Sequence, residues 1–485
     1  MNSRGVRGVL SACAALGALA AATPAFADTL QEALTKAYYD NPQLEAARAQ
    51  QRATDETVVI QRANGLPSMS ASGTYGENLI ESSTSFISPD RSLSAGLDLS
   101  VPLYSAGSVK NSIRAAENRI EAGRADLRGT ESAIFAQVVA AYMDVIRNES
   151  IVGLSANNVD VLEVNLQAAS DRFEIGDVTR TDVAQSESRL ALAQGDLQSA
   201  RANLIAAREN YIALVGDAPD DLQPPPPLPG LPDDVETAVD IALASNPDLI
   251  SAQERAQAAG FDIRVAEAGN MPRVSGFGNS SYQNYLGTLG SANGGSPDQT
   301  STSAQAGVRL SVPIFQGGGP SARQRQATAQ ADAALEQVVA VERSIIAQVR
   351  AAYSSWRAAN QIIASTQTAV DAAELSLEGV RAENTVGNRT ILDILDAQQE
   401  LLRAQVQLVT ARRNAYVAGF NLLATMGRAE ARDLGLGETG TLYDPLDNYE
   451  RVRGIIWDWK SDPAPVADSS RTVDIPAQDA EIPGQ

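Results

Sequence analysis

The reactive groups that stand out in this sequence are two carboxylates in the stretch Gly387-Asn-Arg-Thr-Ile-Leu-Asp-Ile-Leu-Asp396. Asp393 and Asp396 lie three residues apart, so in a helix both leave the same face and could attract a cation. Thr390 precedes Asp393 at the spacing of a capping box. Gly387 tolerates a positive φ and predicts a tight turn before the helix. For Asp393, helix capping and cation binding both stay open.

This stretch occurs twice in the chain, at an offset of 387 − 176 = 211 residues. The matching positions are Gly176 with Gly387, Thr179 with Thr390, and Asp182 with Asp393. Asp396 and Arg389 instead match Gln185 and Val178 in the first copy. Both copies must adopt the same fold. Since Asp396 and Arg389 occur in the second copy only, the fold does not require them.

The repeat extends over most of the sequence. Val101-Pro-Leu-Tyr104 matches Val312-Pro-Ile-Phe315 at the same offset, and Asn41-Pro42 matches Asn246-Pro247 at an offset of 205. The difference, 211 − 205 = 6, predicts an insertion at an exposed loop tip between residues 272 and 312. We expect a leader over 1–27, repeats over 28–218 and 233–427, a proline-rich linker over 219–232, and a partly disordered C-terminal extension over 428–485.

Each repeat should contain long helices and two strands. Apolar residues recur every seven positions from Ile394 to Leu422, a period typical of helices that supercoil on their neighbours. Alternation of apolar and polar residues predicts the strands. The expected helices span 29–63, 106–148, 150–174 and 180–215, then 234–269, 320–359, 361–384 and 390–426. The expected strands span about 69–75, 93–103, 274–289 and 305–314.

The strands allow two interpretations. The run from Leu93 to Leu103 has 11 residues, enough for a tilted strand to cross a bilayer. A sheet half-buried on a soluble core would show the same alternation. We favour a membrane β-barrel because the helices are too long for a compact domain. Four strands cannot close a barrel and lipid forbids open edges, so two copies would supply eight strands and three would supply twelve.

Composition argues against an enzyme and against nucleic-acid binding. The formal charge is −21, and −21 − 2 = −23 once residues 1–27, which carry Arg4 and Arg7, are removed. Such an acidic chain is a poor partner for nucleic acid. The sequence has no histidine, which excludes histidine-based triads and metal sites. Since no phosphate-binding glycine loop or cysteine cluster occurs either, we expect no catalytic residue, cofactor or metal.

The first 27 residues predict an export signal. Two arginines precede a short apolar run, and Ala25-Phe-Ala27 has the pattern of a cleavage site. A rival interpretation is a lipoprotein signal ending at Cys13, but too few apolar residues precede it. We expect the mature protein to begin at Asp28 and to contain no cysteine, because Cys13 is the one cysteine of the chain.

The sequence resembles the TolC-type outer-membrane efflux proteins over nearly its whole mature length. The closest stretches are 387–397, 307–318, and the helix starts at Asn41 and Asn246. The resemblance implies a mainly α fold with a membrane β-barrel, in which a homotrimer forms a 12-stranded barrel on a long α-helical tunnel. It implies a location in the cell outer membrane, extending into the periplasm.

The resemblance also implies a function. Such proteins are the outer-membrane exit duct of a tripartite export system for secreted proteins (type I secretion) or small toxic compounds. The implied partners are a periplasmic adaptor protein, an inner-membrane ABC or proton-driven pump, and outer-membrane lipid. Cargo selection normally lies with the pump, so both cargoes stay open. The alternative is a periplasmic coiled-coil spacer or adaptor that transports nothing.

By resemblance, Asp393 and Asp396 would form acidic rings at the periplasmic entrance, and Arg389 and Asp182 would link the gate. Some relatives carry a gating tyrosine at the position of Asn384, where this sequence departs from them. The residues themselves leave simpler roles open. The sole role of Asp182 and Asp393 could be to cap helices, and Asp396 could be an ordinary solvated acid.

The turns at Gly176 and Gly387 would end two helical hairpins. A glycine is required there by the turn in either interpretation. By resemblance, these hairpin tips would dock the periplasmic adaptor.

Overall fold

The computed structural model describes residues 28–79, 88–290, 295–438 and 441–482. The expected leader and its cleavage site, residues 1–27, lie outside the described residues.

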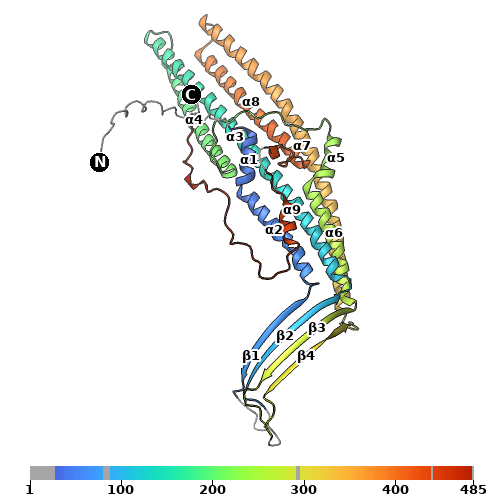
Figure 1. Ribbon diagram of the computed structural model, residues 1–485. Helices are drawn as coiled ribbons and strands as arrows, with labels where there is room; N and C mark the ends of the chain where they lie inside the picture. The colour runs from blue at the N-terminus through green and yellow to red at the C-terminus, as the bar shows by residue number, and fades with distance from the viewer. Residues whose placement is uncertain (1–27, 80–87, 291–294, 439–440, 483–485) are drawn as a thin grey trace, which may run out of the picture.

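Each repeat consists of two short helices, two strands and a long helical hairpin, as the tandem sequence pattern predicted (Figure 1). The first repeat contains α1 (Leu30–Asp40), α2 (Pro42–Ala63), β1 (Ser68–Glu77), β2 (Arg91–Tyr104), α3 (Ser108–Glu174) and α4 (Arg180–Val215). The second contains α5 (Val235–Ser245), α6 (Pro247–Glu267), β3 (Arg273–Asn284), β4 (Thr300–Ser311), α7 (Gly319–Thr385) and α8 (Ile391–Thr425). Helix α9 (Pro445–Val452) lies in the C-terminal extension.

The long arm of each hairpin is one continuous helix, where the sequence predicted two. Helices α3 and α7 each have 67 residues, which is about 100 Å at 1.5 Å per residue. Near the expected breaks, Ser150 donates to the carbonyl of Ile146 at 2.9 Å and Asn360 donates to that of Trp356 at 2.9 Å. Both side chains bond back by one helical turn, so the helix continues through them.

The four strands form one antiparallel sheet in the order β1-β2-β3-β4. Ser72 pairs with Gly96, and their equivalents at offsets of 205 and 211, Phe277 and Gly307, also pair with each other. The two repeats therefore fold into the same hairpin register. Above the sheet in Figure 1, α2, α3, α6 and α7 lie in the same order. The outer edges of this arrangement are β1 with α2 and β4 with α7.

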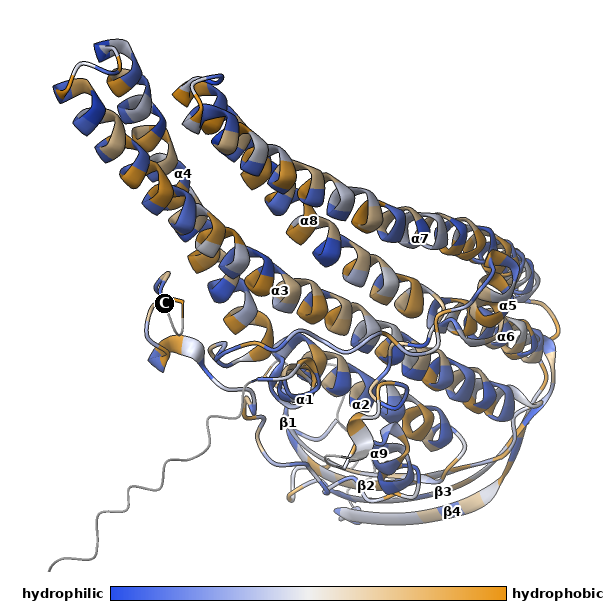
Figure 2. Ribbon diagram, turned by 90° about the horizontal axis from the view of Figure 1, so that it is seen from above, coloured by the Kyte–Doolittle hydropathy of each residue, from blue (hydrophilic) through white to orange (hydrophobic). Residues whose placement is uncertain are grey.

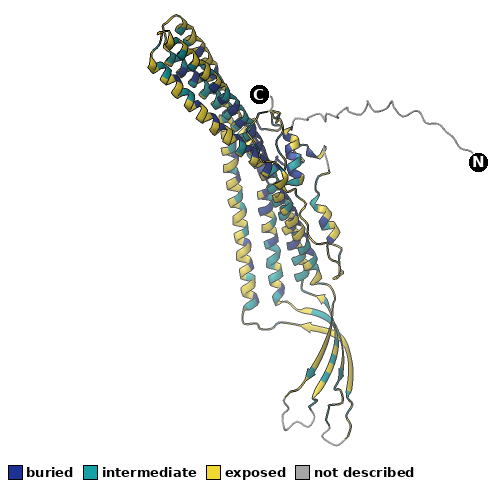
Figure 3. Cartoon of the chain, turned by 90° about the vertical axis from the view of Figure 1, so that its left-hand side faces the viewer, coloured by how far each residue is buried: buried dark blue, intermediate teal, exposed yellow. Residues whose placement is uncertain are grey.

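The register gathers apolar side chains on one face of the sheet. Met69 pairs with Leu99, and Tyr75 pairs with Leu93. On the second hairpin Val274 pairs with Leu310. Directly paired residues share a face, so the predicted alternation becomes a continuous apolar surface. In the single chain these side chains are largely exposed, as Figure 3 shows for the strands, with Met69 at 70% and Leu310 at 63%.

The ends of β3 and β4 differ from the sequence prediction. Strand β3 stops at Asn284 because Leu286 and Gly287 adopt positive φ angles of 52° and 76° and turn the chain. Strand β4 stops at Ser311, before Pro313, which cannot donate to a ladder. The connection between them spans the region where the six-residue insertion was expected.

One asparagine in each repeat joins two helices end to end. The side-chain oxygen of Asn41 accepts from the amides of Gln43 at 2.9 Å and Leu44 at 3.3 Å, and so caps α2. Its amide nitrogen donates to the carbonyl of Leu214 at the end of α4, at 2.9 Å. Asn246 repeats the pattern and donates to the carbonyl of Thr425 at 2.8 Å. The Asn-Pro pairs therefore fix where each returning helix ends.

The main core lies at mid-length, where the hairpins meet the short helices (Figure 3). Its largest fully buried side chains include Phe135, Tyr142, Tyr211 and Phe420. The Tyr142 hydroxyl donates to the carbonyls of Asp28 at 2.9 Å and Gln223 at 2.6 Å. These bonds tie the start of the described chain and the proline-rich linker to α3.

Part of the C-terminal extension packs against the helices. Arg208 on α4 donates to the carbonyls of Asp479 at 3.0 Å and Glu481 at 2.9 Å. Between α9 and these contacts the chain is mostly irregular, and it crosses the outside of the molecule (Figure 1).

Within the described residues, no helix is long and apolar enough to cross a membrane. No group of three or more histidine, cysteine, aspartate or glutamate side chains in the same ranges could hold a metal ion.

Two equivalent glycines, Gly216 and Gly427, give a matched test of the helix joints. Both have positive φ angles, 87° and 71°. A Cβ at Gly427 would lie 2.5 Å from the carbonyl oxygen of Ser245, whereas one at Gly216 would lie 3.1 Å from the Ser470 hydroxyl. We expect Gly216→Ala to cost about 1 kcal/mol through backbone strain alone. Gly427→Ala should cost at least about 2 kcal/mol more, because backbone must move.

The measurement is the midpoint of urea unfolding of each variant. The midpoints are compared on the condition that the dependence of the unfolding free energy on urea concentration is unchanged. Equal losses for the two variants would contradict the close contact between Gly427 and Ser245.

Candidate functional site

Both hairpins end in the same tight turn, and the two tips lie at the same end of the molecule (Figures 1 and 2). Gly176 and Gly387 adopt φ angles of 82° and 79°. The amide of Gly387 donates to the carbonyl of Asn384, and that of Asn388 donates to Glu383, each at 3.0 Å. A Cβ at either glycine would meet nothing within 4 Å. The tips are thus compact and open to a partner, and Ile175 and Val386, beside the two glycines, are exposed by 80% and 70%.

Two capping boxes begin the returning helices, as the sequence predicted. At α8, Asp393 accepts from the Thr390 amide at 2.8 Å, and its own amide donates to the Thr390 hydroxyl at 3.3 Å. At α4, Thr179 and Asp182 make the same pair of bonds, at 2.8 Å and 3.4 Å. The hydroxyl and amide of Thr390 lower the pKa of Asp393, and the amide and hydroxyl of Thr179 lower that of Asp182. Both acids therefore cap helices and carry a negative charge.

Arg389 contacts its own hairpin in the described chain. Its Nε lies 2.7 Å from Glu383 and its guanidinium 3.8 Å from Asp393. Asn384, at the position of the relatives' tyrosine, donates to the Arg389 carbonyl at 2.7 Å and closes the same turn. In the described chain Arg389 and Asp182 each bond within their own hairpin, and the expected gate link stays a prediction.

The hairpins are instead joined near their tips by an arginine that sequence reasoning missed. Arg189 on α4 lies 2.7 Å from Asp396 on α8 and also hydrogen-bonds Gln399. Asp396 is thus paired with Arg189 in the described chain, while its side chain stays 58% exposed. The sequence held a usable signal, because Arg189 follows Asp182 by seven residues and so lies on the same helix face. Arg189 and Asp396 thus join α4 and α8, the returning helices of the two repeats.

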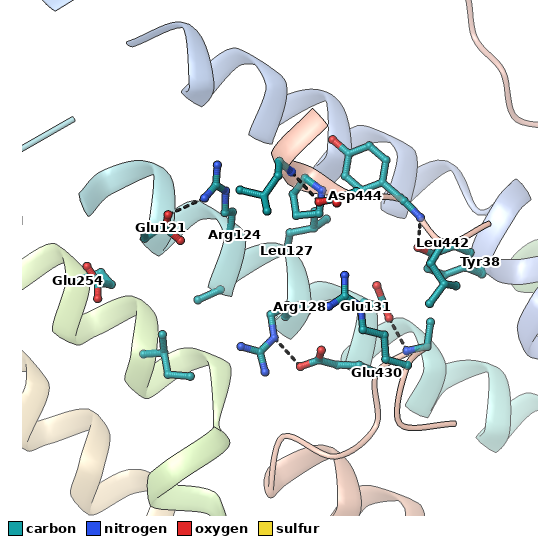
Figure 4. Close-up of a pocket in the computed structure, with 17 residues that line it drawn as sticks. Tyr38, Glu121, Arg124, Leu127, Arg128, Glu131, Glu254, Glu430, Leu442 and Asp444 are labelled. Atoms are coloured by element: carbon teal, nitrogen blue, oxygen red, sulfur yellow. Dashed lines mark hydrogen bonds and ion pairs between the residues drawn. The ribbon is translucent and has the colours of Figure 1, made fainter. Parts of the chain in front are cut away.

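A cavity of about 710 Å³ lies far from the tips, between α3, α6 and the segment 430–446 (Figure 4). Arg128 lies 2.7 Å from Glu430, and Glu131 accepts from the Ala431 amide at 2.5 Å. Burial raises the pKa of Glu131 to about 6. Arg124 pairs with Glu121 on the same helix. Because Arg128 and Glu131 bond to Glu430 and Ala431, we interpret this cavity as the joint that fastens the C-terminal segment.

The chain is similar to known outer-membrane channels. The family model described as "Outer membrane efflux protein" matches residues 33–217 and 238–428, which are the two repeats. The outer membrane efflux protein BepC of Brucella suis biovar 1 is 33% identical over 429 residues, 88% of this chain and 91% of that one. The outer membrane protein TolC of Vibrio cholerae is 26% identical over 432 residues, covering 87% and 95%.

Solved structures share the fold. VceC from Vibrio cholerae has a TM-score of 0.69 at 21% identity and covers 82% of this chain and 96% of its own. CmeC of Campylobacter jejuni has a TM-score of 0.72 at 17% identity, covering 88% and 89%.

These comparisons confirm the expected mainly α, tandem-repeat fold and the outer-membrane location, and they give no support to a spacer that transports nothing. The matching family consists of channels, not enzymes. The two repeats of long hairpins, short helices and paired strands, matched in full by the family model, show that the chain belongs to the outer membrane efflux protein family.

Proposed function

We propose that three copies of this chain form the exit duct of a tripartite export system. The observation that carries the proposal is the open four-stranded sheet, whose edges β1 and β4 are unpaired in the chain. Unpaired backbone groups are not tolerated in lipid, so β4 of one copy must pair with β1 of the next. Three copies close a barrel of about twelve strands, wide enough for an aqueous lumen.

The repeat predicts the register of this pairing. Leu97 on β2 pairs with Ser280 on β3. Their equivalents are 97 + 211 = 308 on β4 and 280 − 205 = 75 on β1. If the contact between copies mirrors the one between repeats, Val308 of one protomer lies opposite Tyr75 of the next.

A cysteine pair tests this closure, because the chain beyond its leader contains no cysteine. Tyr75→Cys with Val308→Cys should give a covalent trimer on oxidation, seen on a non-reducing denaturing gel. The matched control, Thr74→Cys with Val308→Cys, is shifted by one residue, which puts the two thiols on opposite faces. A ladder that stops at dimers or extends beyond trimers, or equal cross-linking of the control, would rule out this closure.

The duct narrows where the inner helices α4 and α8 meet near the tips. Around a threefold axis, Asp393 and Asp396 would each contribute three carboxylates to an acidic constriction that attracts cations. Arg189 would offset part of the charge contributed by Asp396, since the two lie 2.7 Å apart. Arg389 and Asp182 would exchange the contacts within their own hairpins for links between neighbouring protomers at the same level.

Asp396→Asn should relieve block by di- or trivalent cations in planar bilayers, with little loss of thermal stability, because the first repeat carries Gln185 there. Arg189→Gln should strengthen the block, because Asp396 is then unpaired. Asp393→Asn should also relieve block but lower the melting temperature more, because Asp393 caps α8. An unchanged block in Asp396→Asn, or a larger stability loss than in Asp393→Asn, would refute this assignment.

The hairpin tips should dock a periplasmic adaptor that connects the duct to an inner-membrane pump. Three features of the tips support this role: the space around their glycines is open, capping boxes hold the helices that follow them, and they are the outermost points of the helical arms (Figure 2).

Gly387→Trp should abolish export while trimers still form, because the new side chain meets open space in this chain but occupies the docking surface. The matched control is Gly230→Trp in the linker, which also has a positive φ (72°) and open surroundings. Each should cost about 1 kcal/mol of stability. Export and trimer yield of both variants are compared, and loss of trimers in Gly387→Trp alone would reduce the turn to a folding element.

Relatives suggest the range of cargo. The Pseudomonas aeruginosa relative AprF is named an alkaline protease secretion protein, and the Cupriavidus metallidurans relative CzcC is named a cobalt-zinc-cadmium resistance protein. We therefore assign this duct to secreted proteins, small toxic compounds, or both. Identifying the material retained by a deletion strain would decide between them.

A further inference from the structure

Two of the chain's three tryptophans stand exposed on one loop of the C-terminal extension. This loop, residues 453–462, follows α9 and carries Ile456, Trp457 and Trp459, whose exposed fractions are 72%, 71% and 87%. The remaining tryptophan, Trp356, packs against the main core. Clustered large apolar side chains at a surface indicate a binding face. The proposed roles of the duct and of the docking tips do not involve this cluster.

The loop is held firmly rather than trailing from the molecule. Arg62, in the last turn of α2, donates to the carbonyl of Ile455 at 2.8 Å and also to that of Arg453. Arg451 closes the loop through two bonds of 3.0 Å to Asp462. Because α9 is itself fixed to α2, the tryptophans project from a rigid base.

The base of the loop lies at the boundary between the helices and the sheet. Arg62 precedes the start of β1 at Ser68 by six residues. Figures 1 and 3 both show the chain after α9 reaching the end of α2 beside the strands. Exposed apolar side chains mark this boundary on every strand: Leu66 before β1, Leu103 and Tyr104 on β2, Met271 before β3, and Ile314 and Phe315 after β4.

The same boundary is basic in an otherwise acidic chain. Residues 62–69, 103–114, 271–275, 312–325 and 453–462 contain two acids, Asp458 and Asp462. They contain eight basic residues: Arg62, Lys110, Arg114, Arg273, Arg323, Arg325, Arg453 and Lys460. Indole rings and cationic side chains together are typical of the level of lipid headgroups.

We propose that residues 453–462 form a membrane anchor outside the barrel. Trp457 and Trp459 insert among the headgroups of the leaflet nearest the helices, and Arg453 and Lys460 contact lipid phosphates. A second copy is the rival occupant, because α2 is an edge helix. Lipid is favoured because the loop continues the apolar boundary of the sheet, where basic residues outnumber acids eight to two, and carries Arg453 and Lys460 on either side of its tryptophans. The inference rests on the outer-membrane location and does not require the trimer.

Fluorescence quenching tests the anchor in the full-length protein. Trp356→Phe leaves Trp457 and Trp459 as reporters, and the protein is reconstituted into phosphatidylcholine–phosphatidylglycerol vesicles. Lipids brominated at shallow acyl positions should lower the emission about twofold, and deeply brominated lipids should quench less, because indoles lie at the interface. Aqueous acrylamide should quench weakly. The matched control, Trp457→Phe with Trp459→Phe, reports Trp356 alone and should be unaffected by brominated lipid.

Two results would overturn the anchor. Strong quenching by acrylamide without quenching by brominated lipid would place the loop in water. Protection from both quenchers would place it against protein, as in a contact with a second copy. Failure of the cysteine pair on β1 and β4 to cross-link would leave this experiment unaffected, so the two proposals fail separately.

Discussion

The structure depends on one constraint: every backbone amide and carbonyl that enters lipid needs a hydrogen-bond partner. The sheet satisfies this between β1 and β4 but leaves its two outer edges open. A soluble protein could cover such an edge with charge or a loop, whereas a membrane sheet has to be closed by more strands. Assembly is therefore part of folding for this chain, and the apolar face exposed in one protomer becomes the lipid-facing surface of the barrel.

Closing the sheet in the membrane also determines how the helices outside the membrane are arranged. Each strand continues into a helix of the same repeat, so closing the sheet also brings the edge helices α2 and α7 of adjacent copies together. The 67-residue arms transmit this arrangement to the tips. Asn41 and Asn246 fix where the returning helices end, because one side chain serves the start of one helix and the end of another.

The charged side chains near the tips form two kinds of contact, one within a single hairpin and one between the two hairpins. Asp182 and Asp393 are committed to their own capping boxes, and Arg389 to its own turn. Arg189 and Asp396 instead join the repeats across the inner helices. Local pairs stabilise each hairpin whether or not the hairpins move, whereas the Arg189–Asp396 pair depends on their separation. This asymmetry explains why Asp396 occurs in one repeat only.

The capping boxes, the glycine turns and the amphipathic strands could be predicted from the sequence, because each depends on residues close together in the chain. The tandem repeat could be predicted as well, because it needs only a comparison of the sequence with itself. The predicted breaks at residues 148–150 and 359–361 were wrong, because α3 and α7 run through both without interruption. Sequence reasoning also missed Arg189, whose partner lies 207 residues away. Only the tertiary structure decided which helix faces meet, because the distance between α4 and α8 is set by packing over their whole length. The same holds for Trp457 and Trp459, which the fold of the C-terminal extension carries to the level of the strands.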